Sequence, residues 1–99
     1  MKFTKNDLVH KNEYSWKADG GDNPDYRGIK DKVLVDKTEG YEVLYFCNQF
    51  LVDNDFSLTL SNFRHVEHCL RLSELKVVKS RATLYDNIKK NWFIYAFTQ

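Results

Sequence analysis

The side chains best suited to chemistry in this chain are its histidines and cysteines. His65 and Cys69 stand four positions apart, so on a helix they share one face and have the spacing of half a zinc site. The two remaining ligands would have to come from Cys47 and His10, and neither of these belongs to a close pair of ligands. Because structural zinc sites usually combine two close pairs, the sequence favours a core cysteine beside two partly exposed histidines.

A second group with chemical potential surrounds one glutamate. Glu67 lies between His65 and His68, a combination that could serve acid and base roles. No motif supports catalysis, since the sequence contains no Gly-x-Ser-x-Gly elbow, no phosphate loop and no His-Glu-x-x-His pair. We therefore predict a protein that is not an enzyme, with no catalytic residue, no metal, no cofactor and no evident small-molecule substrate.

Aspartates recur at every third position in the segment of residues 19–31, which holds three of the four glycines and the only proline. Converging carboxylates are ligands that calcium prefers, but this spacing does not match the alternating ligands of an EF-hand loop. We interpret the segment as a solvated loop with aspartate-capped turns. The aspartates are Asp19, Asp22 and Asp25.

Composition indicates one globular domain over residues 1–99. The chain is 42% hydrophobic and 15% aromatic, which is enough for a hydrophobic core. Its net charge of +1 is unevenly distributed: residues 1–55 carry 8 Lys and Arg against 11 Asp and Glu, and residues 56–99 carry 7 against 3. The two parts thus have net charges of −3 and +4. Such asymmetry can mark a nucleic-acid-binding face, or it can be two parts of one domain that attract each other.

The sequence predicts a cytoplasmic protein without membrane contact. Residues 1–10 lack the apolar centre of a secretory signal, and the longest apolar stretch is shorter than the ~20 residues that cross a bilayer. Cys47 and Cys69 both stand in apolar helical patterns, which is typical of buried free thiols in a reducing compartment.

The elements that would position these side chains begin with residues 41–52, the most apolar stretch of the chain. Its only polar residues are Glu42, Asn48 and Gln49. A helix that is apolar nearly all round is a buried one, so we expect a central helix over residues 39–53. Asp36 or Thr38 is its predicted N-cap.

Two further helices follow in the predicted order. The second covers residues 62–71 after a Ser61 cap, and the third covers residues 81–91 after a Ser80 cap, with Asn91 ending it in a left-handed conformation. Apolar residues at helical spacing form the buried stripe of each. These stripes are Phe63, Val66, Cys69 and Leu70 in the second helix and Leu84, Tyr85, Ile88 and Trp92 in the third.

Strands are expected at both ends of the chain. Residues 7–18 favour a hairpin with an aromatic face, and residues 92–98 favour a strand that pairs with it. The predicted fold class is therefore α+β, with three helices packed on a small antiparallel sheet made of the N-terminal hairpin and the C-terminal strand.

Residues 80–85, with the sequence Ser-Arg-Ala-Thr-Leu-Tyr, are followed by Ile-Lys-Lys at residues 88–90. This pattern resembles the recognition helix of helix-turn-helix DNA-binding proteins of the resolvase-like, excisionase-like and tetracycline-repressor types. The resemblance implies that Arg81 and Thr83 reach base edges or backbone, while a phosphate binds the helix N-terminus. An ordinary amphipathic helix with good caps would explain the same residues.

These observations favour a small non-enzymatic binding protein, and the sharpest hypothesis is a nucleic-acid-binding regulator that uses a basic C-terminal helix. Its predicted contacts are Lys76, Lys79, Arg81, Thr83, Lys89 and Lys90. The alternative is a protein–protein interaction module, such as a small inhibitor or adaptor from a mobile element, or a homodimer. Fifteen aromatic residues exceed what so small a core holds, and exposed Tyr and Trp favour interfaces. Trp16 and Tyr26 are the residues predicted to bind a protein partner.

Overall fold

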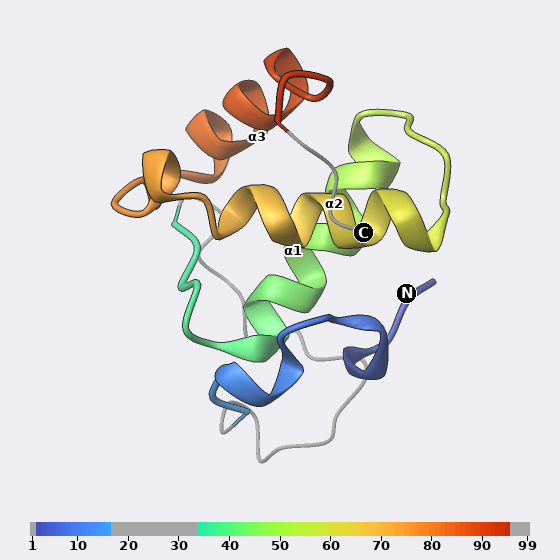
Figure 1. The fold of residues 1–99 in the computed structure, drawn as a ribbon, viewed down its shortest axis with the longest axis vertical. Coiled ribbons are helices and arrows are strands. Elements are labelled where there is room, and N and C mark those ends of the chain that lie inside the picture. Colours follow the sequence, from blue (N-terminus) through green and yellow to red (C-terminus); the bar gives the residue numbers. More distant parts are fainter. Residues whose placement is uncertain (1, 17–33, 96–99) are drawn as a thin grey trace.

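The computed structural model describes residues 2–16 and 34–95, and within these ranges the chain forms helices and turns without a β-strand (Figure 1). Its α-helices are α1 (Gly40–Asp53), α2 (Leu60–Leu70) and α3 (Arg81–Lys90). Short 3₁₀ turns precede and connect them, namely η1 (Lys5–Asp7), η2 (Lys11–Glu13) and η4 (Ser73–Leu75).

Helix α1 is the central element, as its apolar sequence predicts. Phe46, Cys47, Phe50 and Leu51 have no exposed surface, because the other elements surround the helix. Figure 1 shows α2 crossing α1, α3 beyond α2, and the N-terminal segment at the start of α1. The stripes predicted for α2 and α3 are also buried, apart from the half-buried Tyr85.

The third helix begins as predicted, and the first two begin differently. The Ser80 side chain accepts a hydrogen bond from the amide of Thr83 at 3.3 Å. Glu39 caps α1, whereas the expected caps Asp36 and Thr38 bond to each other in the preceding turn. Thr59, two residues before the expected cap, accepts from an amide of the first turn and starts α2. Short polar side chains compete for neighbouring amides at these sites, so spacing alone does not select one.

The expected hairpin over residues 7–18 is wrong throughout its described part, which forms 3₁₀ turns. Side chains of α1 and α2 instead bind backbone groups of the N-terminal segment, residues 2–16. Asn48 of α1 makes hydrogen bonds to both backbone polar groups of Phe3. Its Oδ1 accepts from the Phe3 amide at 2.9 Å, and its Nδ2 donates to the Phe3 carbonyl at 3.1 Å. Glu67 of α2 accepts from the amides of Val9 and His10. The segment therefore docks on helices and needs no sheet.

The expected C-terminal strand is also wrong as far as residue 95, and residues 96–99 lie outside the described part. After α3 the chain continues in turns, and the amides of Ile94 and Tyr95 both donate to the Asn91 carbonyl at 2.9 Å. Asn91 ends α3 at a φ of −109°, outside the left-handed region expected of it. Trp92 is buried in the core, where its ring stacks on that of Phe56 at a centroid distance of 4.5 Å. The α+β class is thus corrected to a helical fold in the described residues.

Candidate nucleic-acid interface

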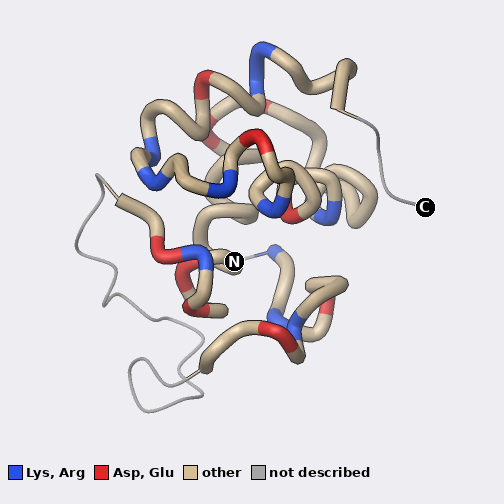
Figure 2. The backbone as a smooth tube through the Cα atoms, turned by 60° about the vertical axis from the view of Figure 1, so that its left-hand side comes forward, with Lys and Arg blue, Asp and Glu red and all other residues tan. Residues whose placement is uncertain are grey.

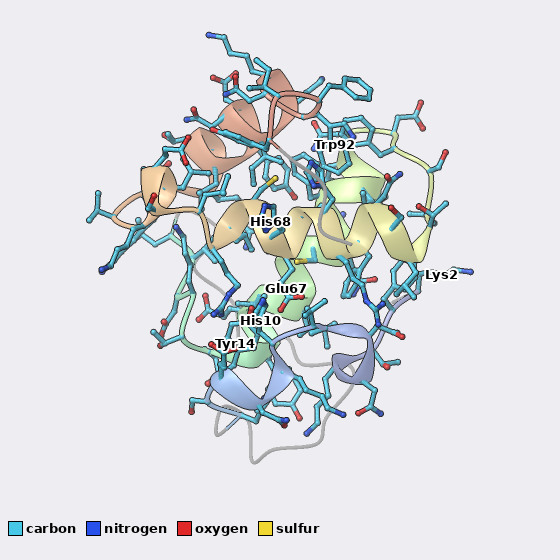
Figure 3. All side chains as sticks on the ribbon, in the orientation of Figure 1. Lys2, His10, Tyr14, Glu67, His68 and Trp92 are labelled. Carbon is cyan, nitrogen blue, oxygen red and sulfur yellow. The ribbon has the colours of Figure 1, made fainter. Side chains whose placement is uncertain are left out.

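Glu67 is buried, and its carboxylate accepts hydrogen bonds from donors of the protein itself. Figure 3 shows the labelled side chains around it. Its carboxylate accepts from Val9 N at 2.8 Å, His10 N at 3.1 Å and the Tyr14 hydroxyl at 2.7 Å. Burial and the bond to Glu67 together raise the pKa of Tyr14. The carboxylate therefore holds the N-terminal segment on α2, and the sequence signal for this role is a charged residue inside an apolar helical stripe.

His65 is fully buried, whereas its place in the sequence pattern predicted partial exposure. Its Nε2 lies 2.9 Å from the Trp92 carbonyl oxygen, and burial lowers the pKa of this imidazole. His68 is half-buried, as expected. Cys69 is a buried free thiol, also as expected, and burial raises its pKa to about 12. Among the described residues, no three His, Cys, Asp or Glu side chains are grouped so that they could hold a metal ion.

Arg81, the predicted base-reading residue, turns toward α1. Its guanidinium lies 5.5 Å from the ring centroid of Tyr45 and 5.6 Å from that of Phe46, which are cation–π distances. Residues 71–80, including η4, separate α2 from α3, where a helix-turn-helix has a turn of three or four residues. The half-buried arginine thus packs against α1, and of the two side chains expected to read bases only Thr83 is fully exposed on α3.

Trp16, predicted to bind a protein partner, is half-buried and contacts several residues of the protein. Its indole Nε1 donates to the Lys11 carbonyl at 2.7 Å, and its ring meets Tyr41 edge-on at 5.0 Å. The indole also covers Gly40, where an added Cβ would lie 2.4 Å from the ring. Trp16 therefore anchors the N-terminal segment on α1, while Tyr26 lies outside the described residues.

The lysines Lys76 and Lys79 lie on a feature that the sequence analysis did not anticipate. Residues 34–38 run beside residues 75–80, joined by the bond from the Val35 amide to the Lys79 carbonyl at 2.8 Å. Between the two segments is a cavity of about 400 Å³, which we call the lysine groove. It is lined by Leu34, Val35, Asp36, Lys37, Thr38, Lys76 and Lys79.

Positive charge dominates the lysine groove. Lys37 donates from its ammonium to the Leu75 carbonyl, and both burial and the nearby charge of Lys79 lower the pKa of Lys37. The one carboxylate in the lining, Asp36, accepts from the amide of Thr38 at 2.9 Å and from its hydroxyl at 2.6 Å. The groove therefore brings like charges together and offers one carboxylate against three ammonium groups.

Lys89 and Lys90 are exposed at the opposite end of α3, roughly 15 Å along the axis of a ten-residue helix. Figure 2 shows basic and acidic positions interspersed over most of the backbone. The lysine groove is accordingly a local concentration of charge. Lys37 was missed because it belongs to the acidic part of the sequence, and only the pairing of residues 34–38 with residues 75–80 reveals it.

Comparison of the chain with protein-family models, with curated protein sequences and with solved structures gave no match. Within residues 2–16 and 34–95, none of the helices combines the length and apolar character that a bilayer crossing requires. The cytoplasmic location and the helix-turn-helix resemblance stay predictions.

Proposed function

We propose that this protein is a non-enzymatic nucleic-acid-binding protein that recognises the phosphate backbone. Lys37, Lys76 and Lys79 bind phosphate at the lysine groove, and Lys89 and Lys90 extend the contact along α3. The observation that carries this proposal is the convergence of three lysines from two distant segments on one groove.

A phosphate group suits this groove for an electrostatic reason. Burial and the positive charge of Lys79 lower the pKa of Lys37, so an anion placed between the two ammonium groups relieves their repulsion. Asp36 opposes an anion, but its one carboxylate is outnumbered by the three ammonium groups of the lining. Lysine binds phosphate as a point charge and tolerates varied geometry. Backbone phosphates, which occur at every nucleotide, therefore fit this set of residues.

The proposed binding mode is independent of base sequence. Reading of bases in the helix-turn-helix manner needs side chains that project into a groove of the duplex, and Arg81 instead packs over the rings of Tyr45 and Phe46. Phosphate contacts give affinity and position without sequence information. We thus expect little difference in affinity between nucleic acids of different sequence.

The test measures the affinity of labelled nucleic acid by fluorescence anisotropy at ~50 mM and ~200 mM salt. With one phosphate contact for each of the five lysines and a single-strand slope of roughly 0.7 per contact, affinity should fall about 130-fold over this range. The variant Lys76→Glu/Lys79→Glu should lower the slope by about two fifths and weaken binding by at least about tenfold at the lower salt concentration. Lys37 stays unchanged in the test because it is bonded to Leu75.

The matched control, Lys2→Glu/Lys11→Glu, makes the same change of charge on the N-terminal segment, away from the lysine groove. It should lose much less affinity than Lys76→Glu/Lys79→Glu. Equal losses in the two variants would mean that net charge alone attracts the ligand and that the groove is no site. Absence of binding at ~50 mM salt would exclude the proposed function altogether.

A further inference from the structure

Phe93 is the most exposed large apolar side chain of the described residues, at 89% accessible surface. The preceding Trp92 points into the core, while the bonds from the amides of Ile94 and Tyr95 to the Asn91 carbonyl turn the chain. Phe93 and Ile94 are consequently directed outward. No other aromatic ring of the described residues stacks on Phe93. The ring thus contributes little to the core and is available to a ligand.

Lys89 and Lys90, the last two residues of α3, precede Phe93 by four and three positions in the chain. The chain passes from α3 into the turns of residues 91–95, with the Asn91 amide bonded to the Asn87 carbonyl at 3.0 Å. Both lysines are exposed, and neither is in an ion pair with an acid among the described residues. The end of α3 therefore carries two exposed lysines within four positions of an exposed aromatic ring.

We propose that Phe93 stacks on an unpaired base while Lys89 and Lys90 bind the phosphates beside it, so that the ligand is a single-stranded nucleic acid. This inference rests on the proposed function and adds the class of nucleic acid. A duplex keeps the faces of its bases inside the stack and shows a protein only phosphates and groove edges. A single strand offers a free π-face at each nucleotide, and aromatic side chains with nearby cations bind it without sequence preference.

A protein partner fits this surface less well. The central part of a protein interface is depleted in lysine, whereas two lysines stand within four positions of Phe93. The lysine groove lies near the N-terminus of α3 and Phe93 lies just past its C-terminus, about 15 Å away along a ten-residue helix. A strand of several nucleotides, within the usual ~4–16 per binding module, is long enough to span this distance.

The experiment compares Phe93→Ala with Ile94→Ala, a neighbouring exposed side chain without a π-system. Three labelled probes of ~15 nucleotides are titrated by anisotropy: oligothymidylate, an abasic strand of the same length, and a hairpin duplex with the same number of phosphates. Phe93→Ala should bind oligothymidylate about tenfold more weakly and leave binding of the other two probes unchanged. Ile94→Ala should stay within about twofold of the wild type for every probe, and Phe93→Tyr should retain the affinity for oligothymidylate.

The possible results separate this inference from the proposed function. If Phe93→Ala binds oligothymidylate like the wild type while Lys76→Glu/Lys79→Glu loses binding, the stacking site is wrong and phosphate binding stands. Equal affinity of the wild type for thymidylate and abasic strands likewise overturns stacking. If Phe93→Ala instead converts a dimer to a monomer in sedimentation with unchanged affinity, the ring belongs to a contact between two copies. No binding of any probe at ~50 mM salt overturns both proposals.

Discussion

Replacing Glu67 by glutamine tests whether its carboxylate holds the N-terminal segment on α2. The change keeps the shape of the side chain but turns one acceptor oxygen into a donor. The carboxylate now accepts from the amides of Val9 and His10 and from the Tyr14 hydroxyl. The hydroxyl can rotate and accept a bond from the new amide, whereas a backbone amide cannot. One backbone donor is therefore left without an acceptor in either orientation of the glutamine.

The expected loss follows from this count of donors and acceptors. An unsatisfied donor in a buried site costs roughly 1–3 kcal/mol, and hydrogen bonds to a charged acceptor are stronger than those to a neutral one. Glu67→Gln should therefore lower the free energy of unfolding by about 2 kcal/mol. For a chain of this size, that loss corresponds to a fall in Tm of roughly 10 °C.

Urea denaturation followed by Trp fluorescence measures the effect, which should appear as a lower midpoint with an unchanged slope. Glu74→Gln makes the same chemical change at an exposed position of η4 and serves as the control. Tyr14→Phe removes one of the three donors, and combined with Glu67→Gln it should give a loss that differs from the sum of the two single losses by at least ~0.5 kcal/mol. A Glu67→Gln midpoint equal to that of wild type would refute the assigned role of the carboxylate.

Three further predictions concern other buried groups. Burial lowers the pKa of His65 below its unfolded value of about 6.5. Between the folded and the unfolded pKa the unfolded chain binds more protons, so the free energy of unfolding should fall as pH drops below ~6.5 and level off below the folded pKa. His65→Gln should reduce this fall, measured as urea midpoints at several pH values. Gly40→Ala should destabilise the fold by roughly 1–3 kcal/mol in urea, because the new methyl group collides with the indole of Trp16, and it should cost less when Trp16 is replaced by alanine. Arg81→Ala should lower Tm, since the Arg81 guanidinium packs on α1. In anisotropy it should reduce nucleic-acid affinity less than Lys76→Glu/Lys79→Glu does. A loss of affinity as large as that of Lys76→Glu/Lys79→Glu would support the recognition-helix resemblance.

Local sequence patterns predicted the helices well. The apolar stretch of residues 41–52 lies in α1, and Ser80 followed by a regular apolar stripe marks the start of α3 within one residue. Periodicity succeeds here because the residues that define a helix face lie three or four positions apart. It failed for residues 7–18, whose alternating aromatic residues favour a strand by themselves. The described residues 7–16 form turns, and Glu67, more than fifty positions away, holds them by accepting hydrogen bonds from the amides of Val9 and His10.

The candidate site was predictable only in part. Lys76, Lys79, Lys89 and Lys90 were identified from the positive charge of residues 56–99. Arg81 was predicted to contact bases or backbone because residues 80–85 resemble a recognition helix. Its position over the rings of Tyr45 and Phe46 depends on how α3 packs against α1, which local sequence patterns do not reveal.

The sequence by itself determined where the three α-helices lie, which of their apolar residues face the core and that both cysteines are buried. Those properties depend on short-range periodicity and on apolar area, which a chain carries with it. Tertiary structure alone decided the partners of the polar groups: Asn48 for Phe3, Glu67 for Val9 and His10, and Lys37 for the groove beside Lys79. Hydrogen bonds and charge pairs need a partner at a defined distance, and here that partner lies more than forty positions away in the chain.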